Sequence, residues 1–215
     1  MPDGTRFTDA IFMDEYNSPF NPSFVVNEFR QVSEDGYATI GSRILPVVVD
    51  LGGGASLESR GQEIPFDPRN LILPMPIIYG QERSAAGRLE EPYLLTAPGF
   101  GLSNAPVSRV LEPETNHNVV GWGKIILPSS SGETSEEDVL LVKVSTRIVE
   151  SYFLNGAPAP TALTSAVGLS GQRVITTALT YYFVSKTRGA VAVLGSGSVN
   201  EGQTPTLTFG YYLND

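Results

Sequence analysis

The sequence contains no cysteine, one histidine and one tryptophan among its 215 residues. Without cysteine, disulfides, thiol nucleophiles and cysteine metal sites are excluded. The lone histidine, His117, excludes a metal site built from several histidines of one chain. No apolar run is long enough to span a bilayer, and the N-terminus lacks the basic start and apolar stretch of a signal peptide. We therefore expect a soluble protein with no membrane span and no cleavable secretion signal.

Positive charge is also scarce. The chain has 14 Lys and Arg residues against 23 Asp and Glu, which gives a formal net charge of -9. The basic residues are scattered, whereas a nucleic-acid groove needs clustered Lys and Arg to displace counterions from phosphates. Binding to an anionic membrane surface also requires clustered Lys and Arg residues. We therefore expect no direct binding to nucleic acid or to lipid.

Hydrophobic residues make up 41% of the chain and charged residues 17%, which is enough for a packed core. The stretch from Asp138 to Leu154 carries the clearest pattern. Its even positions are mainly apolar and β-branched, whereas Lys143, Ser145 and Arg147 occupy odd positions. Alternation of this kind is typical of a strand in an antiparallel sheet that is packed on one face.

Similar but shorter patterns predict further strands. We expect them at residues 24–29, 37–50, 107–111, 118–127, 173–185, 190–194 and 206–213. Pro46 should place the second of these at an edge, bend it or break it in two. Residues 51–70 read as loops, residues 71–79 as an edge strand or an extended crossing, and residues 81–91 as one or two helical turns. Eight to ten strands without a long helix predict an all-β fold, an antiparallel β-sandwich with a jelly-roll arrangement.

We divide the chain into an N-terminal arm, residues 1–22, and a single β-sandwich domain, residues 23–215. The arm has no strand alternation; its apolar residues are spaced by four or five and could form a short amphipathic helix over residues 8–16. These residues are Phe7, Ile11, Phe12, Tyr16 and Phe20. The arm either wraps its own domain or docks on a neighbouring subunit.

The run from Val47 to Ala55, VVVDLGGGA, leads from a strand through Asp50 into three glycines. It resembles the phosphate-binding hairpin of the actin and Hsp70 ATPase family, which would imply glycine amides at phosphate oxygens and Asp50 at a metal. That family needs two related α/β halves and a much longer chain. We therefore expect a flexible loop at the end of a strand.

Other candidate residues could have a catalytic or metal-binding role, but a purely structural or solvent-exposed position also explains them. His117 could act as a base near neutral pH, but no GxSxG nucleophile elbow is present and a loop position is expected. The clustered carboxylates could form the carboxylate pair of a glycosidase or bind calcium loosely. They lie in polar sequence, however, where solvent-exposed charged side chains are the ordinary explanation. They are Glu112 with Glu114, and Glu133, Glu136, Glu137 and Asp138. We assign no catalytic, cofactor or metal residue and expect no enzyme.

Aromatic pairs near the C-terminus could stack on sugar rings. They are Tyr181, Tyr182 and Phe183, and Tyr211 and Tyr212. Adjacent residues of a strand point to opposite faces, so one ring of each pair should belong to the core.

In architecture the chain resembles the single jelly-roll proteins of icosahedral virions, in which an arm docks on neighbours and loops build the outer face. The resemblance implies a structural, non-enzymatic, self-assembling capsid or virion-surface component, located in the virion, with copies of itself or other virion proteins as partners. The arm lacks the Arg and Lys cluster that neutralises a packaged genome, which places the chain on the outer side of a shell, or in a shell whose genome is neutralised otherwise. The alternative is a carbohydrate-binding module, lectin-like or adhesin-like.

Overall fold

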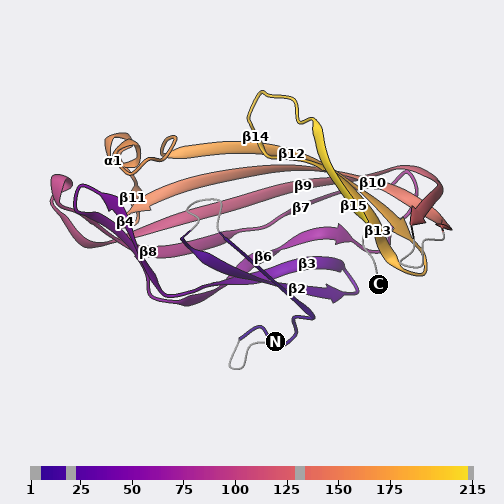
Figure 1. Cartoon of the computed structure of the whole chain (residues 1–215), viewed down its shortest axis with the longest axis horizontal. Coiled ribbons are helices and arrows are strands. Elements are labelled where there is room, and N and C mark those ends of the chain that lie inside the picture. The colour runs from indigo at the N-terminus through magenta and orange to yellow at the C-terminus, as the bar shows by residue number, and fades with distance from the viewer. Residues whose placement is uncertain (1–5, 18–22, 129–133, 213–215) are drawn as a thin grey trace. The chain divides into compact units, whose positions relative to one another are not determined.

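The computed structural model describes residues 6–17, 23–128 and 134–212. Within these residues the chain forms antiparallel strands in two sheets, with one α-helix, α1 (Thr161–Ala166), and one 3-10 turn, η1 (Pro98–Phe100) (Figure 1). The predicted all-β class is therefore confirmed. The jelly-roll arrangement stays a prediction.

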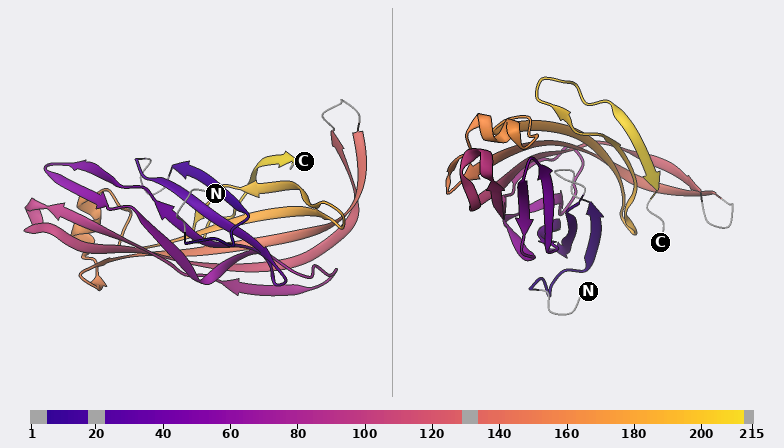
Figure 2. Two further views of the ribbon diagram at one scale, coloured as in Figure 1. Left: turned by 90° about the horizontal axis from the view of Figure 1, so that it is seen from below. Right: turned by 60° about the vertical axis from the view of Figure 1, so that its left-hand side comes forward.

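The smaller sheet has the strand order β1-β2-β3-β6. Its strands are β1 (Phe12–Asn17), β2 (Val25–Ser33), β3 (Gly36–Ile44) and β6 (Gln62–Pro74). Figure 2 shows these indigo and purple strands. Pro65 and Pro68 lie in β6, which is an edge strand, where a residue without an N–H group is tolerated.

The larger sheet has the order β15-β13-β12-β10-β9-β8-β5-β4. Its strands are β4 (Val47–Gly52), β5 (Ala55–Ser59), β8 (Leu89–Ala97), β9 (Leu102–Pro128), β10 (Thr134–Leu154), β12 (Arg173–Ser185), β13 (Gly189–Ser196) and β15 (Leu207–Tyr212). Three short strands pair outside this path: β7 (Glu82–Ala86) with β9, β11 (Ala157–Pro158) with β10, and β14 (Val199–Asn200) with β12.

The chain divides into two compact units, which are described separately. Unit 1 comprises Met1–Ile72, Ala86–Pro113 and Val149–Val174, and unit 2 comprises Leu73–Ala85, Glu114–Ile148 and Ile175–Asp215. Both units contain residues of β6, β9, β10 and β12.

Unit 1 is a sandwich with a continuous apolar core. The ring of Phe24, just before β2, lies with its centroid 5.2 Å from that of Tyr93 in β8. The other buried members of this core come from both sheets and from α1: Val26, Ile44, Val49, Leu57, Ile64, Leu89, Leu95, Ala97 and Leu163. Burial of apolar side chains between two sheets is the main stabilising contribution in such an arrangement.

Unit 2 has a smaller buried cluster. Leu127 of β9 and Val139 of β10 pack with Val191 and Ala192 of β13, and Phe183 of β12 packs against them. Four strands therefore contribute to this cluster.

The structure corrects several expected elements. Residues 51–70 contain the end of β4, all of β5 and most of β6 rather than loops. Residues 81–91 contain β7 and the start of β8 rather than a helix, and the two strands expected at 107–111 and 118–127 are one strand, β9. The described residues thus contain fifteen strands, more than expected. The break at Pro46 is confirmed, since β3 ends at Ile44 and β4 begins at Val47.

The helix expected over residues 8–16 is wrong, because residues 12–17 form β1. This strand pairs antiparallel with β2, from Phe12 opposite Arg30 to Asn17 opposite Val25. Just before it, the ring of Phe7 lies 4.7 Å from that of Phe29, centroid to centroid, and Ala10 completes the cluster. Phe7 and Ala10 therefore pack within their own unit, and β1 pairs there with β2 although its described side chains are exposed. Phe20 lies outside the described residues.

Candidate functional site

The glycine run after Asp50 forms the turn of the β4–β5 hairpin, where a strand end with a flexible loop was expected. Gly52, Gly53 and Gly54 have φ angles of 84°, 60° and 79°, a left-handed backbone that glycine adopts without strain. The Gly52 amide donates to Oδ1 of Asp50 at 2.8 Å. The Asp50 carboxylate thus helps to close a tight turn.

His117 does not lie in a loop, which corrects that expectation. It occupies the middle of β9 with only 3% of its surface exposed, between the buried residues Thr115 and Val119 on the same face of the strand. Together with Arg83 it lines a cavity of about 10 Å³ in unit 2, which has room for one water at most. A substrate does not fit beside this imidazole.

The predicted carboxylate groups form ion pairs. Glu112 lies 3.8 Å from Arg88 and Glu114 lies 3.3 Å from Arg147, with both carboxylates more than half exposed. Glu136 pairs with Lys124 and Glu137 with Arg188, and Asp138 is exposed. Glu133 lies outside the described residues. Among the residues that the structure describes, no three His, Asp or Glu side chains are grouped so that they could hold a metal ion.

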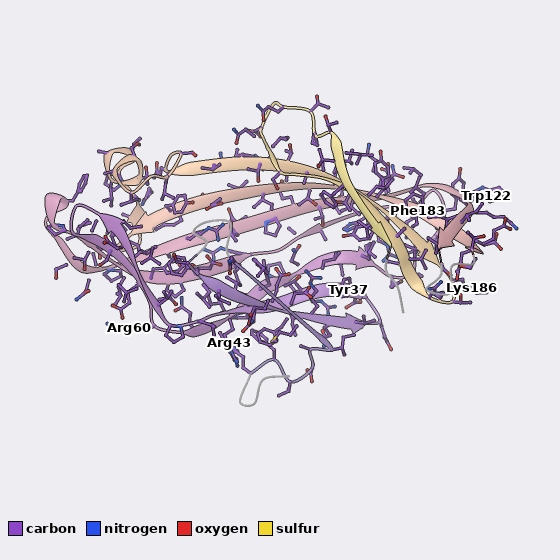
Figure 3. All side chains as sticks on the ribbon, in the orientation of Figure 1. Tyr37, Arg43, Arg60, Trp122, Phe183 and Lys186 are labelled. Carbon is purple, nitrogen blue, oxygen red and sulfur yellow. The ribbon has the colours of Figure 1, made fainter. Side chains whose placement is uncertain are left out.

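The aromatic residues of β12 do not form an exposed platform. Tyr181, Tyr182 and Phe183 are half-buried, and the side chains of Tyr211 and Tyr212 lie outside the described part of the chain. The most exposed aromatic ring among the described residues is instead that of Trp122 in β9, at 76% (Figure 3).

Unit 1 contains a buried charged cluster that was not predicted from the sequence. Its members are Glu91 in β8, Arg109 in β9 and Glu150 in β10, whose side chains are only 5%, 8% and 20% exposed. Arg109 lies 3.0 Å from Glu91 through Nη1 and 2.7 Å from Glu150 through Nε. We call these residues the Glu91–Arg109–Glu150 cluster; it carries a formal charge of minus one.

Two tyrosines complete the hydrogen bonding of this cluster. The Tyr93 hydroxyl donates to Oε2 of Glu91 at 2.9 Å, and the Tyr152 hydroxyl donates to Oε1 of Glu150. Burial, together with the neighbouring carboxylates, raises the pKa of both tyrosines well above the ordinary value of 10.0. Burial alone would lower the pKa of Arg109, but the hydrogen bond to Glu150 and the charge of Glu91 outweigh it and raise that pKa. At neutral pH the tyrosines are therefore protonated and Arg109 is charged.

One signal in the sequence could have revealed this cluster. In β8 the buried residues alternate, and Leu89, Glu91, Tyr93 and Leu95 lie on one face. A glutamate inside an apolar alternation needs a buried partner. The partner itself follows only from the register, which places Glu91 opposite Arg109.

A second unpredicted feature is the edge strand β15, at one of the two ends of the larger sheet. Strand β15 pairs with β13 and, within the described residues, with no other strand. Its sequence, LTFGYY, contains neither a charged residue nor a proline. Leu207 is 44% exposed and Phe209 is 47% exposed. An edge strand offers unpaired N–H and C=O groups to another strand.

No protein-family model matches this sequence, and no curated protein or solved structure matches it. In the described part of the chain, no helix has the length and apolar character that crossing a membrane requires. The function of the chain must therefore be inferred from its own residues.

Proposed function

We propose that this chain is a structural, non-enzymatic protein that assembles with copies of itself through strand β15. The open, uncharged, apolar edge of β15 is the observation that supports this proposal. A viral capsid or virion surface is the setting that the architectural resemblance favours.

The chemistry of the edge supports pairing with another strand. Proteins commonly protect an exposed edge with charged residues, proline, a bulge or a covering segment. In β15 the exposed residues Leu207, Thr208, Phe209 and Gly210 provide no charge and no proline. One register shift, between Leu207 and Phe209, interrupts the pairing with β13. Addition of a strand would satisfy the unpaired backbone groups and remove the apolar side chains from water.

We propose a second copy as the partner for this edge, because β15 carries no charged residue that would repel an identical strand. Two chains that each carry -9 repel each other, so they associate best where the facing surfaces carry no charge. Antiparallel pairing of β15 with β15 of a second copy uses the same residues on both sides. This gives a self-complementary, two-fold contact.

The substitution Leu207→Glu tests this proposal, because it places a charge on each side of the contact. We expect the unmodified chain to form an oligomer, and the variant to require at least about tenfold higher concentration to do so. Light scattering after size separation measures the mass directly.

Leu45→Glu is the matched control, since Leu45 is 37% exposed but lies in unit 1 between β3 and β4. This variant should assemble like the unmodified chain. A monomeric mass for the unmodified chain, or equal loss of assembly in both variants, would contradict the proposal.

Trp122 favours a second candidate, the carbohydrate-binding module. Its exposed ring lies two residues from Lys124, which forms an ion pair with Glu136, so an aromatic surface and charged groups adjoin. Aromatic rings with nearby polar groups suit sugar stacking. Since Trp122 is the only tryptophan, a change of its fluorescence on addition of a glycan would support this candidate.

A further inference from the structure

Unit 1 contains a cavity of about 250 Å³ that the proposed assembly does not use. Residues of β4, β5, β8 and β9, helix α1 and the turn after it surround the space. Its apolar walls include Leu51, Leu57, Leu95, Leu163, Val167 and Leu169. An apolar space of this kind binds molecules that water solvates poorly.

The polar part of the cavity lining includes Ser108 and Thr164 and three residues of the buried charged network. Arg109, Tyr93 and Tyr152 line the cavity, and their side chains form the ion pairs and hydrogen bonds to Glu91 and Glu150. A guanidinium group donates hydrogen bonds and never accepts them. Any polar group of a bound molecule that contacts Arg109 should therefore be an acceptor rather than a donor.

The charge of the cluster selects against an anionic ligand. The charge of Arg109 is already balanced by Glu91 and Glu150, and the three groups together carry minus one. A carboxylate in the cavity would bring this buried site to minus two, which is unfavourable in a medium of low dielectric constant. A neutral acceptor, such as a carbonyl oxygen, adds no charge.

The volume limits the size of the ligand. An engineered cavity of roughly 150 Å³ holds benzene. The cavity in unit 1 is larger, at about 250 Å³, and therefore suits a molecule of about two fused rings.

We propose that unit 1 binds a neutral, mainly apolar small molecule of this size in the cavity lined by α1, with a carbonyl-type acceptor next to Arg109. The polar side chains hold the acceptor end and the leucines and Val167 enclose the apolar body. This site is independent of β15 and of the proposed assembly.

Three probes of nearly equal size test the chemistry separately: 2-acetylnaphthalene, which is neutral with an acceptor; 2-ethylnaphthalene, which is neutral without one; and 2-naphthoate, which is anionic. Titration calorimetry on the full chain gives the dissociation constants. We expect the ketone to bind at least about tenfold more tightly than either analogue, because only the ketone offers an uncharged acceptor.

Substitutions at the cavity wall locate the site. Val167→Trp fills the cavity, and Leu169→Trp does so from a neighbouring position, so a folding failure of one variant leaves the other to be measured. The matched control is Val120→Trp, at a residue of unit 2 that is 42% exposed. Binding of the ketone should weaken at least about tenfold in a folded cavity variant and stay unchanged in the control.

Three results would overturn the inference. The first is that the ketone does not bind up to its solubility limit. The second is that a folded Val167→Trp or Leu169→Trp variant binds it as well as the unmodified chain does. The third is that 2-ethylnaphthalene or 2-naphthoate binds as tightly as the ketone, which would exclude the proposed ligand class.

Discussion

Arg109 is the residue whose environment departs most from that of an ordinary surface cation. It lies between two carboxylates within a sheet, and neither carboxylate has another described cation as its ion-pair partner. A buried ion pair gives little net stability compared with an apolar core, but removal of one partner leaves a buried charge uncompensated. The free energy of unfolding that is lost therefore depends on which residue of the Glu91–Arg109–Glu150 cluster is replaced.

Replacement of Arg109 by methionine should destabilise the chain by about 3–5 kcal/mol near neutral pH, because Glu91 and Glu150 then remain buried without a cation. Urea unfolding near neutral pH measures this loss.

Arg147→Met is the control for this substitution. Arg147 also pairs with two glutamates, Glu114 and Glu201, but all three side chains are at least 34% exposed. Exposed pairs contribute about 0–1 kcal/mol, so this variant should unfold nearly like the unmodified chain. Equal losses in the two variants would show that burial of Arg109 has no energetic role.

At the scale of single elements, the N-terminal segment forms a strand where the sequence predicted a short helix. Its apolar residues show no strand alternation, yet residues 12–17 form β1 because β2 supplies a strand to pair with. Just before β1, the ring of Phe7 covers Gly41, where a Cβ atom would lie 2.1 Å from Phe7 Cζ. Gly41 thus provides the space that the Phe7 ring occupies.

If the segment packs on its own unit, Phe7→Ala should lower the free energy of unfolding by about 3–5 kcal/mol, as expected for a buried aromatic ring. Ile11→Ala, at a residue 53% exposed in the same segment, should change it by less than about 1 kcal/mol. Both should be measured in the Leu207→Glu background, so that assembly does not contribute. Equal stability of the two variants would contradict packing of Phe7 within its own unit.

Individual strands show how far the sequence could be interpreted. The strand expected at 138–154 lies inside β10, and the break at Pro46 is found, because alternation and proline act locally. The helical turns expected at residues 81–91 are wrong, since pairing of β7 and β8 with β9 overrides a weak local preference. The Glu91–Arg109–Glu150 cluster depends on the register of strands distant in sequence, which no local pattern contains.

At the scale of the whole molecule, charge and the open edge act against each other. A chain that carries -9 resists association, whereas an uncharged edge strand favours it. Salt reduces the repulsion, because the screening length falls to roughly 8–10 Å at physiological ionic strength. Assembly through β15 should therefore strengthen as salt is added, the opposite of an assembly held by ion pairs.

Amide hydrogen exchange of β15 at low and high protein concentration shows directly whether this strand pairs with a second copy. We predict slower exchange across Leu207–Tyr212 at high concentration, more so with added salt, and little change in β13, which is already paired on both sides. Leu207→Glu should remove the concentration dependence. If β15 exchanges at the same rate at every protein and salt concentration, the chain does not assemble through this strand.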